Sequence, residues 1–471
     1  MSQDQYYRRI FSFRRLKGLL MIALLPLVGC TTLSGDPVTP VEPIGQFSRS
    51  GQVPPAARWW EALPDEQLQI LEQAALADNP DLLATRARLD QAAALARKTG
   101  AQLLPQVEAG LSRKESDGTR SYVGTLAASY ELDLWGGLQA ETESARQSWL
   151  ASREALDAAA VSLTAEVADT WYQLIEQAGQ IQLLQEQQQT NQQMLELVEL
   201  RFDRGKVQAT DVLQQRQLIE SFEVQLADAR AQQAVLRHQL KALLGKSPTD
   251  PDVTLPVGEL IALPPLPATG LPAQLVQQRP DVREAFHTLR GAEADIATAV
   301  ADRFPSITLG ATLSSTAGGL SNLFNDWVTL LAAELLGPVF DGGQRRAEVD
   351  RSKAAARAAL HDYSSTVIDA LTEVEDALVR ERQQSLLLQS LDRQLALTQE
   401  VVERARYNYT KGSVDYLTVL DALRTHQGLQ RDQLTARRQL LSYRIALHRA
   451  LSGGWLADSL EQDVAALPSN D

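Results

Sequence analysis

Side chains that carry catalysis or hold metal ions are few in this chain, and they are not spaced for either task. Its 471 residues include five histidines, one cysteine and three methionines. No histidine has a second histidine four positions away, the spacing at which two imidazoles on one helix face bind a zinc ion. A glycine-rich phosphate loop and a nucleophile elbow are also missing. The sequence therefore predicts neither an enzyme nor a cofactor, and it assigns the histidines to helix packing or solvent: His238, His287, His361, His426 and His448.

The charge of the chain argues against a nucleic-acid partner. Lysine and arginine number 45 against 59 aspartates and glutamates, so the formal net charge is −14. Proteins that bind nucleic acids normally present a basic face to the phosphate backbone. With 44% apolar and 22% charged residues, the chain is expected to fold.

The single cysteine, Cys30, lies where a lipid can be attached. Basic residues open the chain, and an apolar run from 18 to 28 leads to Leu27-Val28-Gly29-Cys30. A run of 11 residues is too short to span a bilayer and has the length of a signal-peptide core. The segment resembles a bacterial lipoprotein signal, which implies cleavage before Cys30 and lipid attachment to it. Thr31 replaces the aspartate of the usual retention signal, which implies delivery to the outer membrane. The alternative is a free, buried cysteine that follows a short apolar helix.

The rest of the chain contains one unit twice. Asn79-Pro80-Asp81 returns 200 residues later as Arg279-Pro280-Asp281. Farther along the offset is about 207, so that Phe202-Asp203-Arg204-Gly205 corresponds to Tyr409-Thr410-Lys411-Gly412. The predicted organisation is a signal peptide (1–29), an N-terminal lipidated segment (30–60), a first repeat (61–247), a proline-rich linker (248–272), a second repeat (273–455) and a tail (456–471).

Each repeat is expected to contain very long helices. No proline occurs between Pro105 and Pro248 or between Pro338 and Pro468, so nothing in these stretches has to break a helix. Residues 138–203 alone would form a helix roughly 100 Å long. Apolar residues at spacings of three and four predict coiled-coil packing, although an ordinary amphipathic helix has the same pattern over three heptads. The two stripes are Leu388, Leu391, Leu395, Thr398, Val402, Ala405, Tyr409, and Ile181, Leu184, Gln188, Asn191, Leu195, Val198, Phe202. Gln188 and Asn191 predict a partly wet interface.

About four strands are expected, near 106–114, 121–135, 306–316 and 326–340. Alternating side chains in 122–135 and 306–313 are typical of a membrane strand with an apolar outer and a polar inner face, and equally of a strand over a soluble core. Residues 325–340 are apolar on both faces, so the pattern leaves their register open. Membrane barrels need at least about eight strands and tolerate no open edge. Because one chain supplies only about four strands, several chains must combine to close a barrel. Two chains would give eight strands, and three would give twelve.

Several motifs together resemble the TolC-like outer-membrane efflux factor family, in its NodT-type lipoprotein branch. Besides the lipobox they are Trp59-Trp60-Glu61, Asn79-Pro80-Asp81-Leu82, Tyr130-Glu131-Leu132-Asp133-Leu134-Trp135-Gly136, Arg279-Pro280-Asp281-Val282, Pro338-Val339-Phe340-Asp341-Gly342-Gly343 and the stretch from Gly412 to Asp421. The resemblance implies a mainly α fold with a membrane β-barrel. It also implies a homotrimer with a twelve-stranded barrel in outer-membrane lipid and a twelve-helix periplasmic tunnel. Drugs or small solutes would reach this passive conduit from an inner-membrane pump of the RND type through a periplasmic adaptor.

The same resemblance assigns a gate to the turns that join the long helices. Asp211 would supply the carboxylate of a polar lock, Tyr409 its phenol and Asp421 an acidic ring, with Thr210 and Asp415 beside them. Val414 stands where the family's lock has an arginine, and Thr418 where some members have a second acidic ring. The alternative role of these residues is turn formation and helix capping. The adaptor is expected to contact the turns 201–207 and 406–414, including Arg201, Phe202, Gly205, Tyr409 and Gly412.

Two other functions share parts of this pattern. An outer-membrane factor for type I protein secretion would have the same fold and a different partner. A structural lipoprotein would use the coiled coils to brace the periplasm without a pore. The shortage of methionine disfavours a thioether path for copper or silver ions. The sequence does not identify the exported substrate.

Overall fold

The structure is a computed structural model that describes residues 45–54, 58–116, 119–251 and 260–456. The predicted signal peptide, Cys30 and residues 457–471 lie outside these ranges. All described residues belong to one compact unit, Pro43–Asp471.

The same order of elements occurs twice along the chain. The first half contains α2 (Glu66–Asp78), α3 (Pro80–Gly100), β1 (Gln106–Ser116), β2 (Thr119–Leu132), α4 (Gly137–Asp203) and α5 (Ala209–Leu243). The second contains α6 (Pro272–Gln278), α7 (Pro280–Ala301), β3 (Ser306–Ala317), β4 (Val328–Leu336), α8 (Gln344–Lys411) and α9 (Tyr416–Leu451). From α3 to α7 the start moves by 200 residues, and from α4 to α8 and from α5 to α9 it moves by 207. The long helix expected at 138–203 is α4, and α8 is its counterpart.

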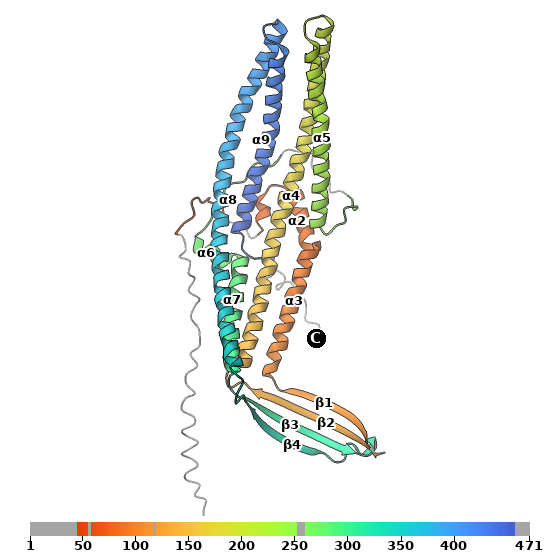
Figure 1. Ribbon diagram of the computed structural model, residues 1–471, viewed down its shortest axis with the longest axis vertical. Helices are drawn as coiled ribbons and strands as arrows, with labels where there is room; N and C mark the ends of the chain where they lie inside the picture. Colours follow the sequence, from red (N-terminus) through yellow and green to blue (C-terminus); the bar gives the residue numbers. More distant parts are fainter. Residues whose placement is uncertain (1–44, 55–57, 117–118, 252–259, 457–471) are drawn as a thin grey trace, which may run out of the picture. The chain divides into compact units, whose positions relative to one another are not determined.

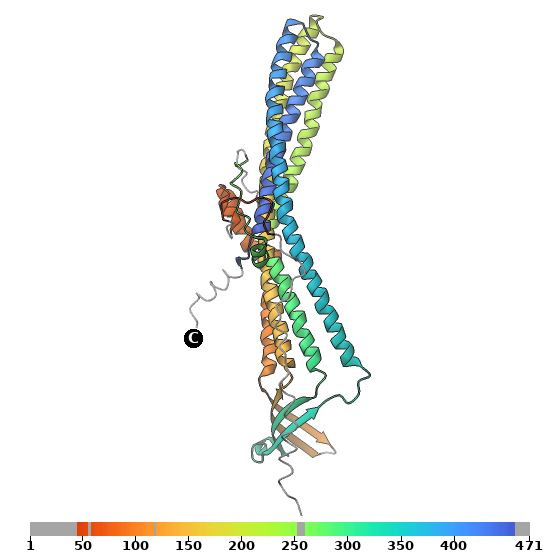
Figure 2. The same ribbon diagram turned by 90° about the vertical axis from the view of Figure 1, so that its left-hand side faces the viewer.

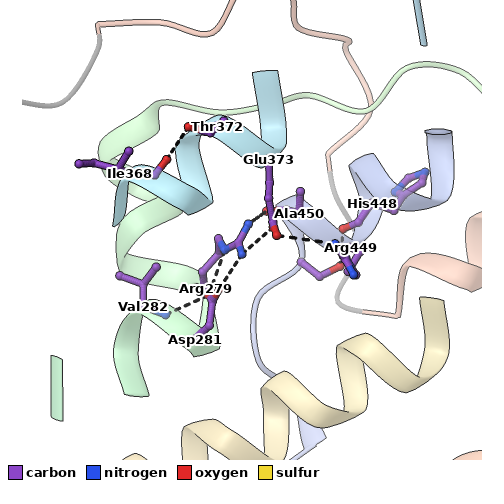
Figure 3. A network of polar contacts seen from close by, with 10 residues as sticks. Arg279, Asp281, Val282, Ile368, Thr372, Glu373, His448, Arg449 and Ala450 are labelled. Atoms are coloured by element: carbon purple, nitrogen blue, oxygen red, sulfur yellow. Dashed lines mark hydrogen bonds and ion pairs between the residues drawn. The ribbon is translucent and has the colours of Figure 1, made fainter. Parts of the chain in front are cut away.

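In each repeat, the residue that precedes the Pro-Asp pair makes a polar contact with the end of a long helix. The contact joins the start of α3 to the end of α5 in the first repeat, and the start of α7 to the end of α9 in the second. Asn79 caps α3 and donates from Nδ2 to the carbonyl of Leu243 at the end of α5, at 2.9 Å. Arg279 donates from Nη1 to the carbonyl of Ala450 at the end of α9, at 3.1 Å. Figure 3 shows this second tie, in which the guanidinium also reaches the Asp281 carboxylate at 2.6 Å and the Glu373 carboxylate of α8 at 2.9 Å. Two carboxylates compensate for the burial of the Arg279 charge.

The four strands form one antiparallel sheet in the order β1-β2-β3-β4. Ile307 stands opposite Leu132 on β2 and opposite Leu335 on β4, and directly opposite residues share a face of the sheet. The register that the sequence left open is therefore settled. Apart from polar side chains toward one end, which include Arg113, Ser315 and Thr329, one face is apolar across all four strands: Val107, Ala109, Leu111, Leu126, Ala128, Tyr130, Leu132, Ile307, Leu309, Ala311, Leu313, Leu331, Ala333 and Leu335. The other face carries Glu108, Ser112, Thr125, Ser129, Glu131, Thr308, Thr312, Ser314 and Glu334, together with the apolar Val123, Val328, Leu330 and Leu336.

Two strands end earlier than the sequence pattern suggests, and local contacts explain why. β2 stops at Leu132 because the next residue, Asp133, accepts hydrogen bonds from the N–H groups of Leu138 and Gln139 at 3.1 and 2.8 Å. These bonds begin α4. β4 stops at Leu336, and the adjacent Gly337 lies so close to Pro305 that a Cβ there would come within 2.7 Å of its ring.

The long helices form two hairpins, α4 with α5 and α8 with α9, and α4 also packs on α9 and α7 (Figures 1 and 2). One apolar cluster packs around Trp59, Trp60, Leu68, Trp171 and Tyr172. A second cluster lies near the tips of the hairpins, and its buried residues include Met194, Leu195, Val198, Phe222, Val402, Ala405, Tyr409, Tyr416 and Leu420. No helix within the described ranges is both long and apolar enough to cross a membrane.

The predicted coiled-coil stripes agree with burial at the hairpin tips, except at Gln188 and Phe202. Gln188 is partly exposed, and Gln187 beside it is buried instead. Asn191, Leu195 and Val198 are buried on α4, as Val402, Ala405 and Tyr409 are on α8. Phe202 closes the first stripe but remains 44% exposed, whereas its counterpart Tyr409 is 4% exposed.

Candidate functional site

The hairpin tips bring most of the predicted gate residues together. Gly205 follows α4 with φ of +65°, and Gly412 follows α8 with φ of +78°. This left-handed backbone favours glycine. Each glycine therefore ends a long helix and lets the chain return as α5 or α9.

Arg201 of α4 clamps the end of α8. Its guanidinium carbon lies 4.2 Å from the centre of the Tyr409 ring, a cation–π contact. Its two terminal nitrogens donate to the carbonyls of Tyr409 at 3.1 Å and Thr410 at 3.4 Å. The last carbonyls of a helix have no partner within the helix, and a cation there is favourable. Arg201, predicted as an adaptor contact, thus joins the tips of the two hairpins within one chain.

Tyr409 is buried between its neighbours but lacks the hydrogen bond that the resemblance implies. Its ring centre lies 5.7 Å from that of Tyr416, and burial raises the pKa of its phenol. In the described part of the chain its Oη atom has no hydrogen-bond partner. Asp211, the expected acceptor, instead accepts the N–H of Gln208 at 3.0 Å and caps α5.

The remaining gate candidates lie around the same turns. The Thr210 hydroxyl donates to the side-chain oxygen of Gln208 at 3.3 Å. Asp415 caps α9 and accepts from the hydroxyl and N–H of Thr418 at 2.7 and 3.0 Å, which lowers the pKa of the Asp415 carboxyl. Val414 packs against the second apolar cluster. Asp421 is exposed one position after the buried Leu420.

A buried polar seam continues from the tips along the contact of α4 with α9. Asn191 donates to the side-chain oxygen of Gln427 at 3.1 Å, and Gln187 donates to the carbonyl of Gln427 at 3.1 Å. Gln215 of α5 donates to the carbonyl of Asn191 at 2.6 Å and accepts the hydroxyl of Tyr416. Asn191 and Gln215 are fully buried.

Sequence reasoning identified Asn191 but missed Gln215, Tyr416 and the Arg201 clamp. The available signal for Gln215 was a polar residue on the apolar stripe that holds Val212, Leu218 and Phe222. Such a residue on a buried stripe needs a partner from a neighbouring helix. For Arg201 there was no signal in the spacing, because its contact crosses from one repeat to the other.

Among the described residues, no group of three or more His, Cys, Asp or Glu side chains is arranged to hold a metal ion.

Several characterised proteins are similar over almost the whole chain. The cation efflux system protein CusC of Escherichia coli is 32% identical over 450 residues, covering 92% of this chain and 97% of that protein. The pyoverdine export outer membrane protein OpmQ of Pseudomonas putida is 32% identical, covering 92% and 97%. The probable outer membrane lipoprotein SilC of Salmonella typhimurium is 31% identical, covering 94% and 99%.

Solved structures agree in fold. The outer-membrane channel OprN matches with a TM-score of 0.82 at 28% identity, covering 89% of this chain and 99% of that one. A crystal structure of CusC matches with a TM-score of 0.79 at 29% identity, covering 90% and 100%. The long helices and four antiparallel strands expected from the sequence are thus confirmed.

A sequence model described as outer membrane efflux protein matches residues 71–246 and 271–453, which are the two repeats. This match and the relatives confirm the predicted class of protein, an outer-membrane channel of efflux systems and not an enzyme. The chain belongs to the outer membrane efflux protein family.

Proposed function

We propose that three copies of this chain form a tube, with a twelve-stranded barrel in the outer membrane and twelve long helices in the periplasm. The open sheet carries this proposal. Among the described residues β1 and β4 each have one neighbouring strand, and both are exposed along their whole length. An open strand edge is not tolerated in lipid. Three sheets of four strands close these edges and leave a lumen, whereas eight strands from two copies would be filled by side chains.

The two faces of the sheet support the orientation in the membrane. The apolar face defined above suits contact with lipid. The opposite face, which includes Glu108, Glu131 and Glu334, suits a water-filled interior. The barrel thus leads solutes outward from the helical tunnel, and negative charge in its wall favours cations.

The chain acts at the outer end of a three-part export system. Drugs or small solutes enter the tunnel from an inner-membrane pump of the RND type through a periplasmic adaptor. The adaptor contacts the hairpin turns around Gly205 and Gly412, where Phe202 is 44% exposed and open to a partner. The names of the relatives, which refer to cation, pyoverdine and toluene efflux, support export in preference to a bracing role.

At the hairpin tips the tube has a closed aperture. Arg201 and Tyr409 hold the two hairpins of one chain together, and Asp211 lies in the first turn of α5, the helix that follows Gly205. Three copies of Asp421 form an acidic ring that attracts cations. Binding of the adaptor at the turns favours the open state directly.

The assembly is tested on protein purified in detergent. Native mass spectrometry should give three times the mass of the mature chain, and planar bilayers should show channels. A monomer that conducts would exclude closure by three sheets. A trimer that never conducts, even with the hairpin turns removed, would favour the structural lipoprotein.

The lipid anchor on Cys30 is a separate part of the proposal, supported by the lipoprotein name of SilC. Radiolabelled palmitate should enter the wild-type chain and not Cys30→Ser. Equal labelling of both would place the lipid on another residue, and no labelling of either would mean that the chain carries none. Because the barrel also inserts, Cys30→Ser should keep part of its export activity.

A further inference from the structure

Two arginines interrupt the apolar face of the sheet at the end that lies away from the helices. Figure 1 shows this end of β1 and β2. Arg113 of β1 stands opposite Tyr122 of β2. One step farther along the same face, Glu115 stands opposite Arg120. These positions continue the alternation of the apolar face, since Leu111 precedes Arg113 by two residues. In the proposed barrel their side chains therefore point toward lipid.

The two arginines share one carboxylate. Nη2 of Arg113 lies 2.7 Å from Oε2 of Glu115, and Nε of Arg120 lies 3.4 Å from the same oxygen. The three side chains together keep one net positive charge. Both arginine side chains are more than half exposed. Each guanidinium has five N–H donors, and those that Glu115 does not use can donate to a phosphate group.

The depth of these arginines matches the boundary of a membrane. Tyr122 lies ten residues from Leu132 along β2, which is about 34 Å at roughly 3.4 Å per residue. In a barrel whose strands tilt by about 40°, that length covers roughly 26 Å of bilayer, and the apolar band of a membrane barrel is about 25 Å tall. Arg113, level with Tyr122, therefore lies where the acyl chains end and the phosphate groups begin.

The loop between β3 and β4 adds an apolar surface at the same end of the sheet. It begins beside Arg120, whose carbonyl oxygen lies 4.0 Å from the place of a Cβ on Gly318. A Cβ on Gly124 would lie 3.6 Å from the side chain of Leu323, which is 2% exposed. Gly124 stands opposite Leu111 on the apolar face. The loop thus folds over the face that the barrel turns toward lipid.

This loop leaves several large apolar side chains uncovered. Leu320 and Phe324 are 55% and 72% exposed. Trp327 is also exposed, and its ring centre lies 6.3 Å from that of Phe324. Aromatic side chains are typical of the interface between acyl chains and head groups. Arginines and apolar side chains thus occur together at one end of one face, as a lipid with phosphate groups and acyl chains requires.

We propose that this end of each sheet binds a phosphorylated, acylated lipid of the outer leaflet. Arg113 and Arg120 hold its phosphate groups, and Leu320 and Phe324 contact its acyl chains. Glu115 keeps the two guanidinium groups together, so that both can donate to one lipid. The inference rests on the proposed barrel, which turns this face toward lipid, and it assigns to that face a site for one class of lipid.

Native mass spectrometry of the trimer in detergent, titrated with bis-phosphorylated lipid A, measures the affinity. Arg113→Ala with Arg120→Ala should weaken binding roughly 30-fold, because each arginine beside a layer of lipid phosphates contributes about a factor of five. Arg113→Lys with Arg120→Lys keeps both charges and should keep most of the affinity. Leu320→Ser with Phe324→Ser should also weaken binding, and an unchanged affinity in that variant would contradict the acyl-chain contact.

Lys114 provides the matched control for charge. It lies beside Arg113 on the same strand but stands opposite Ser121 on the polar face. Lys114→Ala should therefore bind lipid A as the wild type does. Equal weakening in Lys114→Ala and in the double alanine variant would mean that the overall charge of the hairpin, and not this site, attracts the lipid.

Two further probes separate a lipid from a free anion. Lipid A without phosphate groups should bind the wild type as weakly as bis-phosphorylated lipid A binds the double alanine variant. Millimolar inorganic phosphate should not displace the bound lipid, and displacement would overturn the assignment to lipid.

Failure of the site and failure of the tube have different results. A conducting trimer that binds lipid A equally well with and without Arg113 and Arg120 would refute the site and leave the tube in place. A chain that stays monomeric would refute the tube and, with it, the orientation of this face.

Discussion

At the scale of single residues, His448 makes stability depend on acidity. Its ring stacks on Trp59, with centres 5.6 Å apart, and is 6% exposed. Neither ring nitrogen has a hydrogen-bond partner among the described residues. Burial, followed by the charge of Arg444, lowers the pKa of His448 to about 4. The folded chain therefore keeps His448 neutral, while the unfolded chain takes up a proton near pH 6.5.

We expect the folded chain to lose stability as the pH falls from about 6.5 to about 4. In that window the unfolded state binds a proton at His448, whereas the folded state does not. The loss amounts to about 3 kcal/mol per chain at most. His448→Phe keeps an aromatic ring on Trp59 but cannot bind a proton. Over this pH range the variant should therefore lose about 3 kcal/mol less of its free energy of unfolding than the wild type, at most. Denaturant unfolding at pH 7 and pH 4.5, followed by tryptophan fluorescence, measures the difference. The exposed His238, changed to Phe, is the control, and an unchanged acid dependence in His448→Phe would contradict the assignment.

The clamp at the hairpin tip gives a second prediction at this scale. Arg201→Ala removes one cation–π contact and two hydrogen bonds, a loss of about 1–3 kcal/mol in each copy. In a trimer each of the three copies loses this stabilisation of the closed state. The open state is then more populated, so single-channel conductance in bilayers should rise. Tyr409→Phe keeps the ring under Arg201 and should behave like the wild type if the clamp alone holds the aperture. If Tyr409→Phe also raises conductance, its hydroxyl is bonded to another copy in the closed tube.

Arg204 provides the matched control, because it is an exposed arginine on the same turn. Arg204→Ala removes the same charge and no contact with Tyr409. A rise in conductance in Arg204→Ala equal to that in Arg201→Ala would mean that charge at the tips, and not the clamp, controls opening.

At the scale of elements, patterns within one segment were readable from the sequence and contacts between segments were not. The proline-free stretches predicted α4 to within one residue of its start. All four strands lie where strands were expected, and alternation supported β2 and β3 among them. Repeat arithmetic located the paired turns at Gly205 and Gly412. The face of β4 could not be predicted, because both of its faces are apolar and only pairing with Ile307 and Leu309 decides between them.

The polar seam shows the same limit. Asn191 was visible as a polar residue on an apolar stripe, but its partner Gln427 is more than 200 positions away. Similarly, Phe202 and Tyr409 occupy equivalent positions, yet only Tyr409 is covered. Their difference follows from packing between the repeats, which a repeating sequence does not encode in either copy alone.

At the scale of the whole molecule, the proposed barrel predicts opposite outcomes for two neighbouring residues. Leu330 and Leu331 follow one another on β4 and are 62% and 77% exposed. Leu331 stands opposite Ala311 on the apolar face, and Leu330 stands opposite Thr312 on the polar face. In the closed barrel, Leu331 would therefore face lipid and Leu330 the lumen.

An arginine at Leu331 should cost up to about 2–4 kcal/mol in each copy if the position lies near the middle of the bilayer. Leu330→Arg places the same charge in water and should cost far less, while it lowers cation preference in the lumen. The yield of trimer in outer-membrane fractions measures the first effect, and reversal potentials in bilayers measure the second. Both variants replace a leucine by arginine at neighbouring positions of one strand, so general damage to β4 would lower both yields equally. Equal loss would contradict the assignment of faces, and a larger loss for Leu330→Arg would mean that the sheet is turned the other way in the membrane.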